Sequence, residues 1–260
     1  MDILLDGPNN FDYGVAREWV KDRRGMMVQI VAAYLMGLYV SKRAMHKRPA
    51  YDLQLPLILW NIGLAAFSFV GFYYVASEYW ETYQLMGFRA TYCDVRQFFH
   101  GTTGYWVWLF TVSKIFELGD SFFLVLRKRP LTFLQWYHHA LTLTYCWLSY
   151  IEAPVFNRIG TLSNLTVHSF MYTYFLLRAL KIRMPAVVAR SVTTLQILQF
   201  IISTTLLVHG FYEWYLGVQC DWPSTIGYVA LVMNGSYLVL FVEFFVRAYC
   251  LKQHSTYKHE

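Results

Sequence analysis

The sequence predicts an all-α polytopic membrane protein with seven transmembrane helices and an internal polar cavity, and three observations support this. Of its 260 residues, 57% are hydrophobic and only 15% are charged, whereas soluble domains carry about 25% charged residues. The chain contains seven mostly apolar stretches of about 20 residues, the length that crosses a bilayer as a helix. Polar and ionisable side chains recur inside four of these stretches. Such side chains are costly in lipid and therefore face a protein interior.

The seven expected helices follow one another without a linker, an internal repeat or a low-complexity segment, so we expect one membrane domain over residues 1–260. No cleavable signal peptide is visible, and the first apolar run would act as an uncleaved signal anchor. A net charge of +6 does not indicate a nucleic-acid partner, because the basic residues cluster between apolar runs. The expected helices cover approximately residues 26–45, 55–80, 104–126, 131–151, 159–180, 187–210 and 224–249.

The connections between these helices alternate in charge. Those after the first, third and fifth helices are basic, as is the C-terminal tail, and the opposite connections are mostly acidic. Glu78 and Arg158 are counted among the charges of these opposite connections, at the lumenal membrane surface. By the positive-inside rule the basic side is cytosolic, which makes the N-terminus lumenal and the C-terminus cytosolic. One basic cluster before the first helix opposes this assignment: Arg17, Lys21, Arg23 and Arg24. We give more weight to the three internal connections.

Two cysteines lie in polar, aromatic loops that this topology places on the lumenal side. Cys93 is in the second connection and Cys220 is in the sixth. Disulfides persist in the oxidising lumen. We therefore expect a bond between them, with two free thiols as the alternative.

The third expected helix carries three ionisable residues. Lys114, Glu117 and Ser121 share one face at i, i+3 and i+7, and Asp120 lies beside them. A self-neutralised Lys114–Glu117 pair that merely orients the bundle is one interpretation. The number of charges and their common face favour a water-filled cavity.

The fourth helix carries two adjacent histidines. Gln135, His138 and His139 lie at i, i+3 and i+4, and Thr142 and Tyr145 continue the same side. Neutral imidazole is a nucleophile and a base near neutral pH. These histidines could also be hydrogen-bonded core residues, but the polar stripe above and below them favours a site.

The fifth and sixth helices add further polar residues. On helix five these are Asn164 and His168 at i, i+4, followed by Met171, Tyr172 and Tyr174, and on helix six they are Thr193, Gln196 and Gln199. For helix six, hydrogen bonding between helices is at least as good an explanation as a catalytic role. At 1.5 Å rise per residue the polar positions on all four helices lie roughly 9–18 Å from the cytosolic surface. We therefore expect one cavity, entered from the cytosol.

Two other functional classes fit parts of this pattern. His138, His139 and His168 could hold one zinc ion, as in a metal-dependent membrane oxidoreductase, but hardly two irons. We expect no metal. A seven-helix transporter or receptor is the other class, although the chain has no obvious inverted repeat or broken helix pair.

Four motifs in this order resemble those of the ELO family of very-long-chain fatty acid elongases. FLQWYHH resembles the family's histidine box FLHxxHH, and KIFELGDS resembles K-x-x-E-x-x-D-T through Lys114, Glu117 and Asp120. NLTVHSFMYTYF is similar to N-x-x-x-H-x-x-M-Y-x-Y-Y, and TTLQILQ is similar to T-x-x-Q-x-x-Q. By motif the resemblance covers residues 114–199.

The resemblance implies the condensing step of fatty acid elongation at the endoplasmic reticulum membrane. An acyl-CoA and malonyl-CoA would give a 3-ketoacyl-CoA, carbon dioxide and CoA without a metal or other cofactor. The expected partners are these two substrates, the lipid bilayer, and the reductases and dehydratase that complete the cycle; a homodimer is left open and no nucleic acid is expected. CoA phosphates would bind a basic cytosolic rim, with these candidates: Arg127, Lys128, Arg129, Arg178, Lys181 and Arg183.

The resemblance suggests a role for each polar group. His138 would attack the thioester and carry the acyl group, while His139 and His168 would act as base or stabilise the oxyanion. A direct condensation without an acyl-histidine is the alternative. Gln135 departs from the family, which usually has histidine there. Glutamine forms hydrogen bonds but does not titrate, so we expect Gln135 to orient the histidine pair in an active enzyme.

Overall fold

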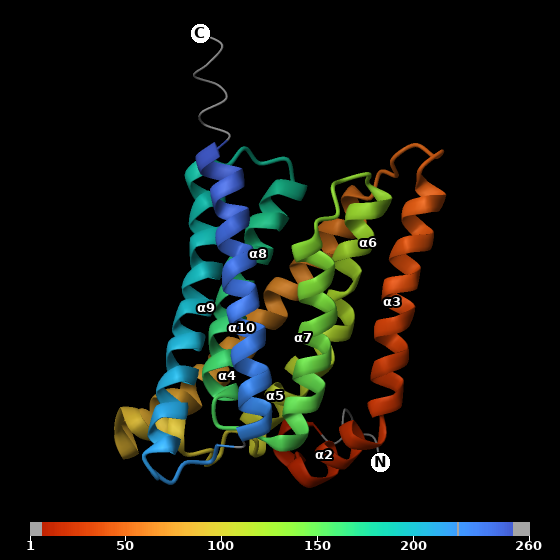
Figure 1. Cartoon of the computed structure of the whole chain (residues 1–260). Helices are drawn as coiled ribbons and strands as arrows, with labels where there is room; N and C mark the ends of the chain where they lie inside the picture. The colour runs from red at the N-terminus through yellow and green to blue at the C-terminus, as the bar shows by residue number, and fades with distance from the viewer. Residues whose placement is uncertain (1–6, 223, 252–260) are drawn as a thin grey trace.

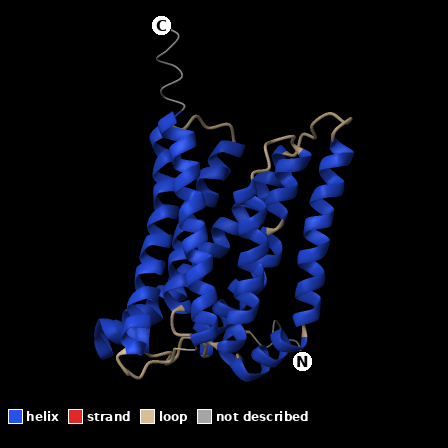
Figure 2. Cartoon of the chain, in the orientation of Figure 1, coloured by secondary structure: helices blue, strands red, loops and turns tan. Residues whose placement is uncertain are grey.

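The computed structural model of this chain describes residues 7–222 and 224–251, and these residues form helices and loops without any strand (Figure 2). In chain order the elements are η1 (Pro8–Asn10), α2 (Tyr13–Asp22), α3 (Arg24–Met45), α4 (Gln54–Cys93), α5 (Gly101–Glu117), α6 (Gly119–Leu126), α7 (Phe133–Glu152), α8 (Asn157–Ala179), α9 (Ala186–Tyr215), α10 (Ser224–Phe245) and the π-helical η2 (Val246–Leu251).

Four helical stretches are long and apolar enough to cross a membrane. They are α3, α4, α9 and the run Thr225–Leu251. The remaining expected segments are also helical, as α5 with α6, α7 and α8. These helices carry most of the polar residues that the sequence analysis singled out, which lowers their mean hydropathy.

Six helices pack as a ring. The order of contacts is α4, α5, α7, α10, α9 and α8, and α8 closes the ring by packing along α4. Helix α3 lies outside the ring against α6 and α7, at the edge of the bundle in Figure 1. The helices of the ring thus place their inner faces around a common interior.

The loops gather at the two ends of the bundle (Figure 1). Loops 46–53, 127–132 and 180–185 form one end, which we call the basic end; there the Tyr51 amide donates to the Leu126 carbonyl (3.0 Å). Helix α2, the end of α4 with Cys93 and the loop with Cys220 form the other, which we call the disulfide end. This grouping agrees with the alternation of charge in the sequence.

Helix α2 is an element that the sequence analysis did not predict. The Asp12 side chain caps it by accepting from the Val15 amide (3.1 Å), and Ala16 and Val20 bury its apolar face. It closes the end of α7, because Trp147 Nε1 donates to the Val20 carbonyl (2.8 Å). The polar composition of the first 25 residues hid this amphipathic spacing.

Helix α4 extends far beyond the expected end at residue 80. Glu78 suggested a membrane surface, but it is buried and pairs with the fully buried Arg158 at 2.9 Å. The Arg158 guanidinium also donates to the carbonyls of Asp94 (2.8 Å) and Val95 (2.7 Å). Gly87 has φ 79°, a conformation that favours glycine, and lets the last part of α4 turn toward Arg158.

Two other boundaries differ from expectation. The segment 104–126 is interrupted at Leu118, where Gly119 lies so close to Trp60 that a Cβ atom would be 2.7 Å from its ring. This approach lets Trp60 Nε1 donate to Asp120 (2.7 Å). The segment 224–249 ends as the π-helical η2, a form that is frequent at functional sites.

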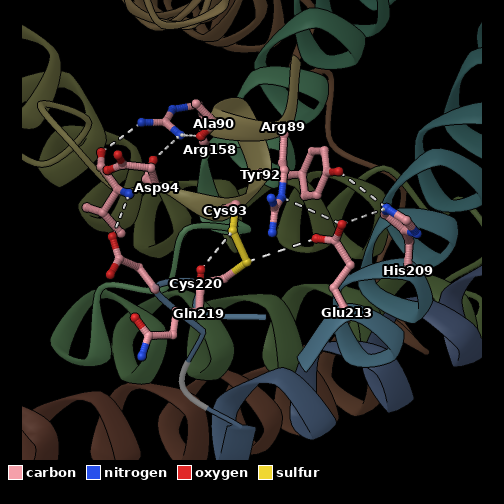
Figure 3. The surroundings of a disulfide bond; sticks show 12 residues. Arg89, Ala90, Tyr92, Cys93, Asp94, Arg158, His209, Glu213, Gln219 and Cys220 are labelled. Atoms are coloured by element: carbon pink, nitrogen blue, oxygen red, sulfur yellow. Dashed lines mark hydrogen bonds and ion pairs between the residues drawn. A yellow bond between two sulfur atoms is a disulfide. The ribbon is translucent and has the colours of Figure 1, made fainter. Parts of the chain in front are cut away.

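Cys93 and Cys220 form a disulfide with a Cα–Cα distance of 4.6 Å, the pairing that the loop positions predicted. It joins the end of α4 to the loop before α10 (Figure 3). The Asp221 amide donates to the Cys93 carbonyl (2.9 Å), and the Val95 amide donates to the Asp221 carboxylate (2.9 Å). The two loops are therefore fixed to each other at several points.

Candidate functional site

A chamber of about 660 Å³ lies inside the ring and reaches the basic end. Side chains from α4, α6, α7, α8, α9 and α10 line it, together with Tyr249 of η2. Most of the predicted site residues are among these side chains: Asp120, Arg127, Gln135, His138, His139, Asn164, His168, Tyr172, Tyr174, Thr193, Gln196 and Gln199. Four sequence motifs therefore converge on one chamber.

Helix α7 presents His138 to the chamber. The Thr132 hydroxyl caps this helix by accepting from the main-chain N–H of Gln135 (3.3 Å). This cap fixes the start of the helix that carries both histidines. The His138 ring packs on Tyr237 (centroids 4.7 Å apart), and the Tyr237 hydroxyl donates to the His138 main-chain carbonyl (3.1 Å). Among the described residues no side chain hydrogen-bonds to the His138 imidazole. Its ring nitrogens are thus free toward the chamber.

His139 lies in a network with Gln135 and Asp120. Gln135 Nε2 is 2.8 Å from His139 Nε2, and Asp120 Oδ2 is 4.0 Å from the same nitrogen. The Asp120 carboxylate is held from both sides, because Trp60 Nε1 (2.7 Å) and the Tyr172 hydroxyl (2.9 Å) donate to it. Helices α4, α6, α7 and α8 together fix the orientation of His139.

Lys114 and Glu117 lie one layer behind the chamber rather than on its wall, which corrects the expected common cavity for the third helix. Both are buried, and Lys114 Nζ donates to Glu117 Oε1 (2.7 Å) and to Asn164 Oδ1 (2.9 Å). A buried charge needs such a partner. The pair therefore supports the residues on the wall instead of meeting a substrate.

This support reaches His168 through Asn164. Because the Asn164 oxygen accepts from Lys114, its amide nitrogen faces His168 Nε2 at 3.3 Å and donates to it. His168 then carries its proton on Nδ1, which lies 3.7 Å from Glu117 Oε1. His168 is thus oriented by Asn164 with its Nδ1 toward Glu117, whereas no side chain of the described residues hydrogen-bonds to the His138 ring.

The α9 stripe also faces the chamber. Gln196 Nε2 contacts Met171 Sδ of α8 (3.3 Å), a weak acceptor that leaves most of the amide available. Thr193 Oγ1 lies 3.2 Å from the Tyr249 hydroxyl. A bridging role between helices therefore applies to Thr193 more than to Gln196 and Gln199.

The basic rim contains fewer residues than the sequence suggested. Arg127, Arg129 and Arg178 line the chamber where it reaches the basic end. Lys128 does not line it; its ammonium donates to the His46 carbonyl (3.5 Å). Three guanidinium groups on one rim form a site suited to phosphate.

A narrower extension continues from the chamber toward the disulfide end. The two spaces meet at four shared residues: His138, Asn164, Gln199 and Phe200. Side chains of α5, α7, α8, α9 and α10 line the extension, and toward the disulfide end its lining includes three aromatic side chains: Tyr92, Phe156 and Trp222. His138 thus stands where the wide chamber meets a narrower and more apolar passage.

Sequence reasoning missed two residues of the site. Trp60 of α4 holds Asp120, and Tyr237 of α10 supports His138. Both lie in helices read only as apolar spans. The one available signal was that tryptophan and tyrosine normally find hydrogen-bond partners when buried.

Comparison with known proteins agrees with this geometry. Residues 19–257 match the GNS1/SUR4 family, ELO. The chain belongs to the ELO family. Among curated relatives, long chain fatty acid elongase 1 of Caenorhabditis elegans is 43% identical over 251 residues, which cover 96% of this chain and 87% of that protein.

Two further relatives are similar over most of their length. Long chain fatty acid elongase 2 of Caenorhabditis elegans is 39% identical over 233 residues, covering 88% of this chain and 84% of that protein. Very long chain fatty acid elongase 6 of Drosophila melanogaster is 34% identical over 249 residues, which cover 95% of this chain and 79% of that protein. In this ELO chain each of the four motifs thus contributes side chains to one chamber, and Gln135 is among them.

Proposed function

We propose that this chain is a fatty acid elongase that catalyses the condensing step, in which an acyl-CoA and malonyl-CoA give a 3-ketoacyl-CoA, carbon dioxide and CoA. One observation supports this most directly. The His138 ring, to which no side chain of the described residues hydrogen-bonds, stands between a wide chamber with an arginine rim and a narrower, more apolar passage. That arrangement suits a thioester whose CoA phosphates bind the rim and whose acyl chain enters the passage.

The proposed reaction has two stages. A ring nitrogen of His138 attacks the acyl thioester carbon, the C–S bond breaks, and the displaced proton passes to the CoA sulfur. Malonyl-CoA then loses carbon dioxide, and the resulting enolate attacks the acyl-imidazole carbon. The new C–C bond forms as the C–N bond breaks, and His138 takes up one proton from solvent. No metal, redox cofactor or other co-reactant is needed to balance these steps.

The surrounding groups have supporting roles in this proposal. His139, held by Gln135 and Asp120, and His168, held by Asn164, stabilise the oxyanion or accept a proton. Direct condensation, in which the histidines only polarise the carbonyls, is the competing mechanism. Intact mass spectrometry after incubation with acyl-CoA alone distinguishes the two mechanisms, because only the covalent route leaves an acyl group on the protein.

The same proposal includes the cellular setting. Seven spans formed by the helical segments of the structure would cross the endoplasmic reticulum membrane as one domain, with the basic end cytosolic and the disulfide end lumenal. The charge alternation and the disulfide support this orientation. The reductases and dehydratase of the cycle would use the 3-ketoacyl-CoA released at the cytosolic side.

The function is tested with purified protein, a long-chain acyl-CoA and malonyl-CoA. We expect release of carbon dioxide together with a 3-ketoacyl-CoA two carbons longer, and dependence on both substrates. A transporter, a receptor or a metal-dependent oxidoreductase would give no product in this assay. Absence of product from folded protein over a ladder of acyl-CoA lengths would contradict the proposal.

Gln135 provides a second prediction. If Gln135 only orients His139, Gln135→His retains activity within about threefold, whereas Gln135→Ala lowers kcat about five- to tenfold, the equivalent of one lost hydrogen bond. The measurement is kcat and KM for the same acyl-CoA. A tenfold or greater gain in Gln135→His would show instead that the missing histidine limits this enzyme.

A further inference from the structure

The narrow extension of the chamber ends in a wall of three buried aromatic side chains: Tyr92, Phe156 and Trp222. We call these three residues the end wall. They come from the end of α4, the loop before α8 and the loop before α10. The Trp222 ring packs on Phe156 with centroids 4.8 Å apart and on Phe211 at 5.5 Å.

Trp222 fits against α9 because that helix carries Gly210. A Cβ atom at Gly210 would overlap the Trp222 ring, so only glycine lets the indole lie directly on the helix. Gln199, which lines both spaces beside His138, precedes Gly210 by eleven residues on α9. At helical rise this separation is roughly 16 Å. The distance corresponds to roughly a dozen carbons of a zigzag chain, built from C–C bonds of about 1.5 Å.

The disulfide is directly attached to the end wall. Tyr92 immediately precedes Cys93, and Trp222 follows Cys220 by two residues. Figure 3 shows Tyr92 beside the two bonded cysteines. Within the described residues the Trp222 indole nitrogen has no hydrogen-bond partner. The position of this ring therefore depends on packing and on the loop that the disulfide fixes.

We propose that Trp222 limits the length of the acyl chain that the passage accepts, and that the Cys93–Cys220 disulfide holds it in that position. The proposal rests on the proposed function, because it assumes that the passage holds the acyl chain. Each methylene group short of the wall gains apolar burial. A further methylene group must displace a packed indole ring, which discriminates against the longer substrate.

The test is a ladder of acyl-CoA substrates of increasing length with malonyl-CoA. For each variant we compare kcat/KM for the first acyl-CoA beyond the wild-type limit with kcat/KM for the longest good substrate. In Trp222→Ala this ratio is expected to rise about tenfold, the discrimination of a methylene group. Trp222→Phe is expected to raise the ratio by a smaller factor. Trp214→Ala changes an exposed tryptophan near the end of α9 and is expected to leave it unchanged.

A Cys93→Ser/Cys220→Ser double variant tests the second part of the proposal, and its ratio is expected to rise several-fold with Trp222 intact. If both Trp222 variants give the same ratio as Trp214→Ala, Trp222 does not set the chain-length limit. If Trp222→Ala fails to fold, the ratio measured for Trp222→Phe tests the role of Trp222. A wild-type ratio in the double serine variant would overturn the role of the disulfide. Failure of the wild type to extend any acyl-CoA would instead contradict the proposed function.

Discussion

His138→Ala is expected to abolish formation of the 3-ketoacyl-CoA while leaving the fold intact. The His138 ring faces the chamber without a hydrogen-bond partner among the described residues, so its removal leaves no buried group unsatisfied. The size of the loss distinguishes two mechanisms. Loss of a general base or polarising group costs about 10²- to 10⁴-fold, whereas loss of a covalent nucleophile costs more, up to about 10⁶-fold. We expect a decrease in kcat of more than about 10⁴-fold.

Intact mass spectrometry provides the independent measurement. Incubation with acyl-CoA alone is expected to add one acyl group to the wild type and none to His138→Ala. His100→Ala is a matched control, because His100 is an exposed histidine at the disulfide end. It is expected to retain both the adduct and the activity. An active wild type that forms no adduct, with a loss in His138→Ala of only about 10²- to 10⁴-fold, would favour direct condensation.

Tyr237 provides a finer comparison within the same site. Its hydroxyl donates to the His138 carbonyl and lies 2.9 Å from Thr142 Oγ1, while its ring packs on the imidazole. Tyr237→Phe keeps the packing and removes only the hydrogen bonds, so we expect a loss of kcat of about tenfold or less. A loss as large as that of His138→Ala would assign the Tyr237 hydroxyl a direct part in the chemistry.

The residues of the chamber could be predicted because polar side chains in apolar helices are few and follow helical spacing. Gln135, His138 and His139 share one side of α7, and this required no knowledge of the neighbouring helices. It was less predictable which polar residues line the chamber and which lie behind its wall. Lys114 and Glu117 lie behind the wall because helix α8 brings Asn164 between them and the chamber, and packing between distant segments is not visible in the spacing of one helix.

Charge misled the prediction at helix ends. Glu78 and Arg158 were both read as residues of the membrane surface, but they neutralise each other in the interior, 80 positions apart in sequence. The apolar helices gave the opposite error. Trp60 and Tyr237 looked like ordinary hydrophobic residues, and their roles arise from partners on other elements.

Arg158→Ala is expected to cause a severe loss of stability. The Arg158 side chain is fully buried, pairs with both oxygens of Glu78 at 2.9 Å, and donates to carbonyls at the end of α4 and in the loop that follows. Removing one partner of a buried ion pair costs about 3–5 kcal/mol, because the other charge stays buried without compensation. The freed carbonyls add to this cost. We expect a large fall in the melting temperature in detergent, with little folded protein.

Arg89→Ala is the matched control for this prediction. Arg89 lies at the same end of α4 and pairs with Glu213 at 3.7 Å, but its side chain is 56% exposed, and such a pair contributes about 0–1 kcal/mol. Arg158→Lys tests geometry separately from charge, since an ammonium has three donors and cannot reproduce the planar guanidinium fork. We expect its melting temperature to fall between those of the wild type and Arg158→Ala. If Arg158→Ala melts at the same temperature as Arg89→Ala, the buried ion pair does not stabilise the turn after Gly87. The end of α4, and with it Tyr92 of the end wall, would then be positioned by the disulfide and local packing alone.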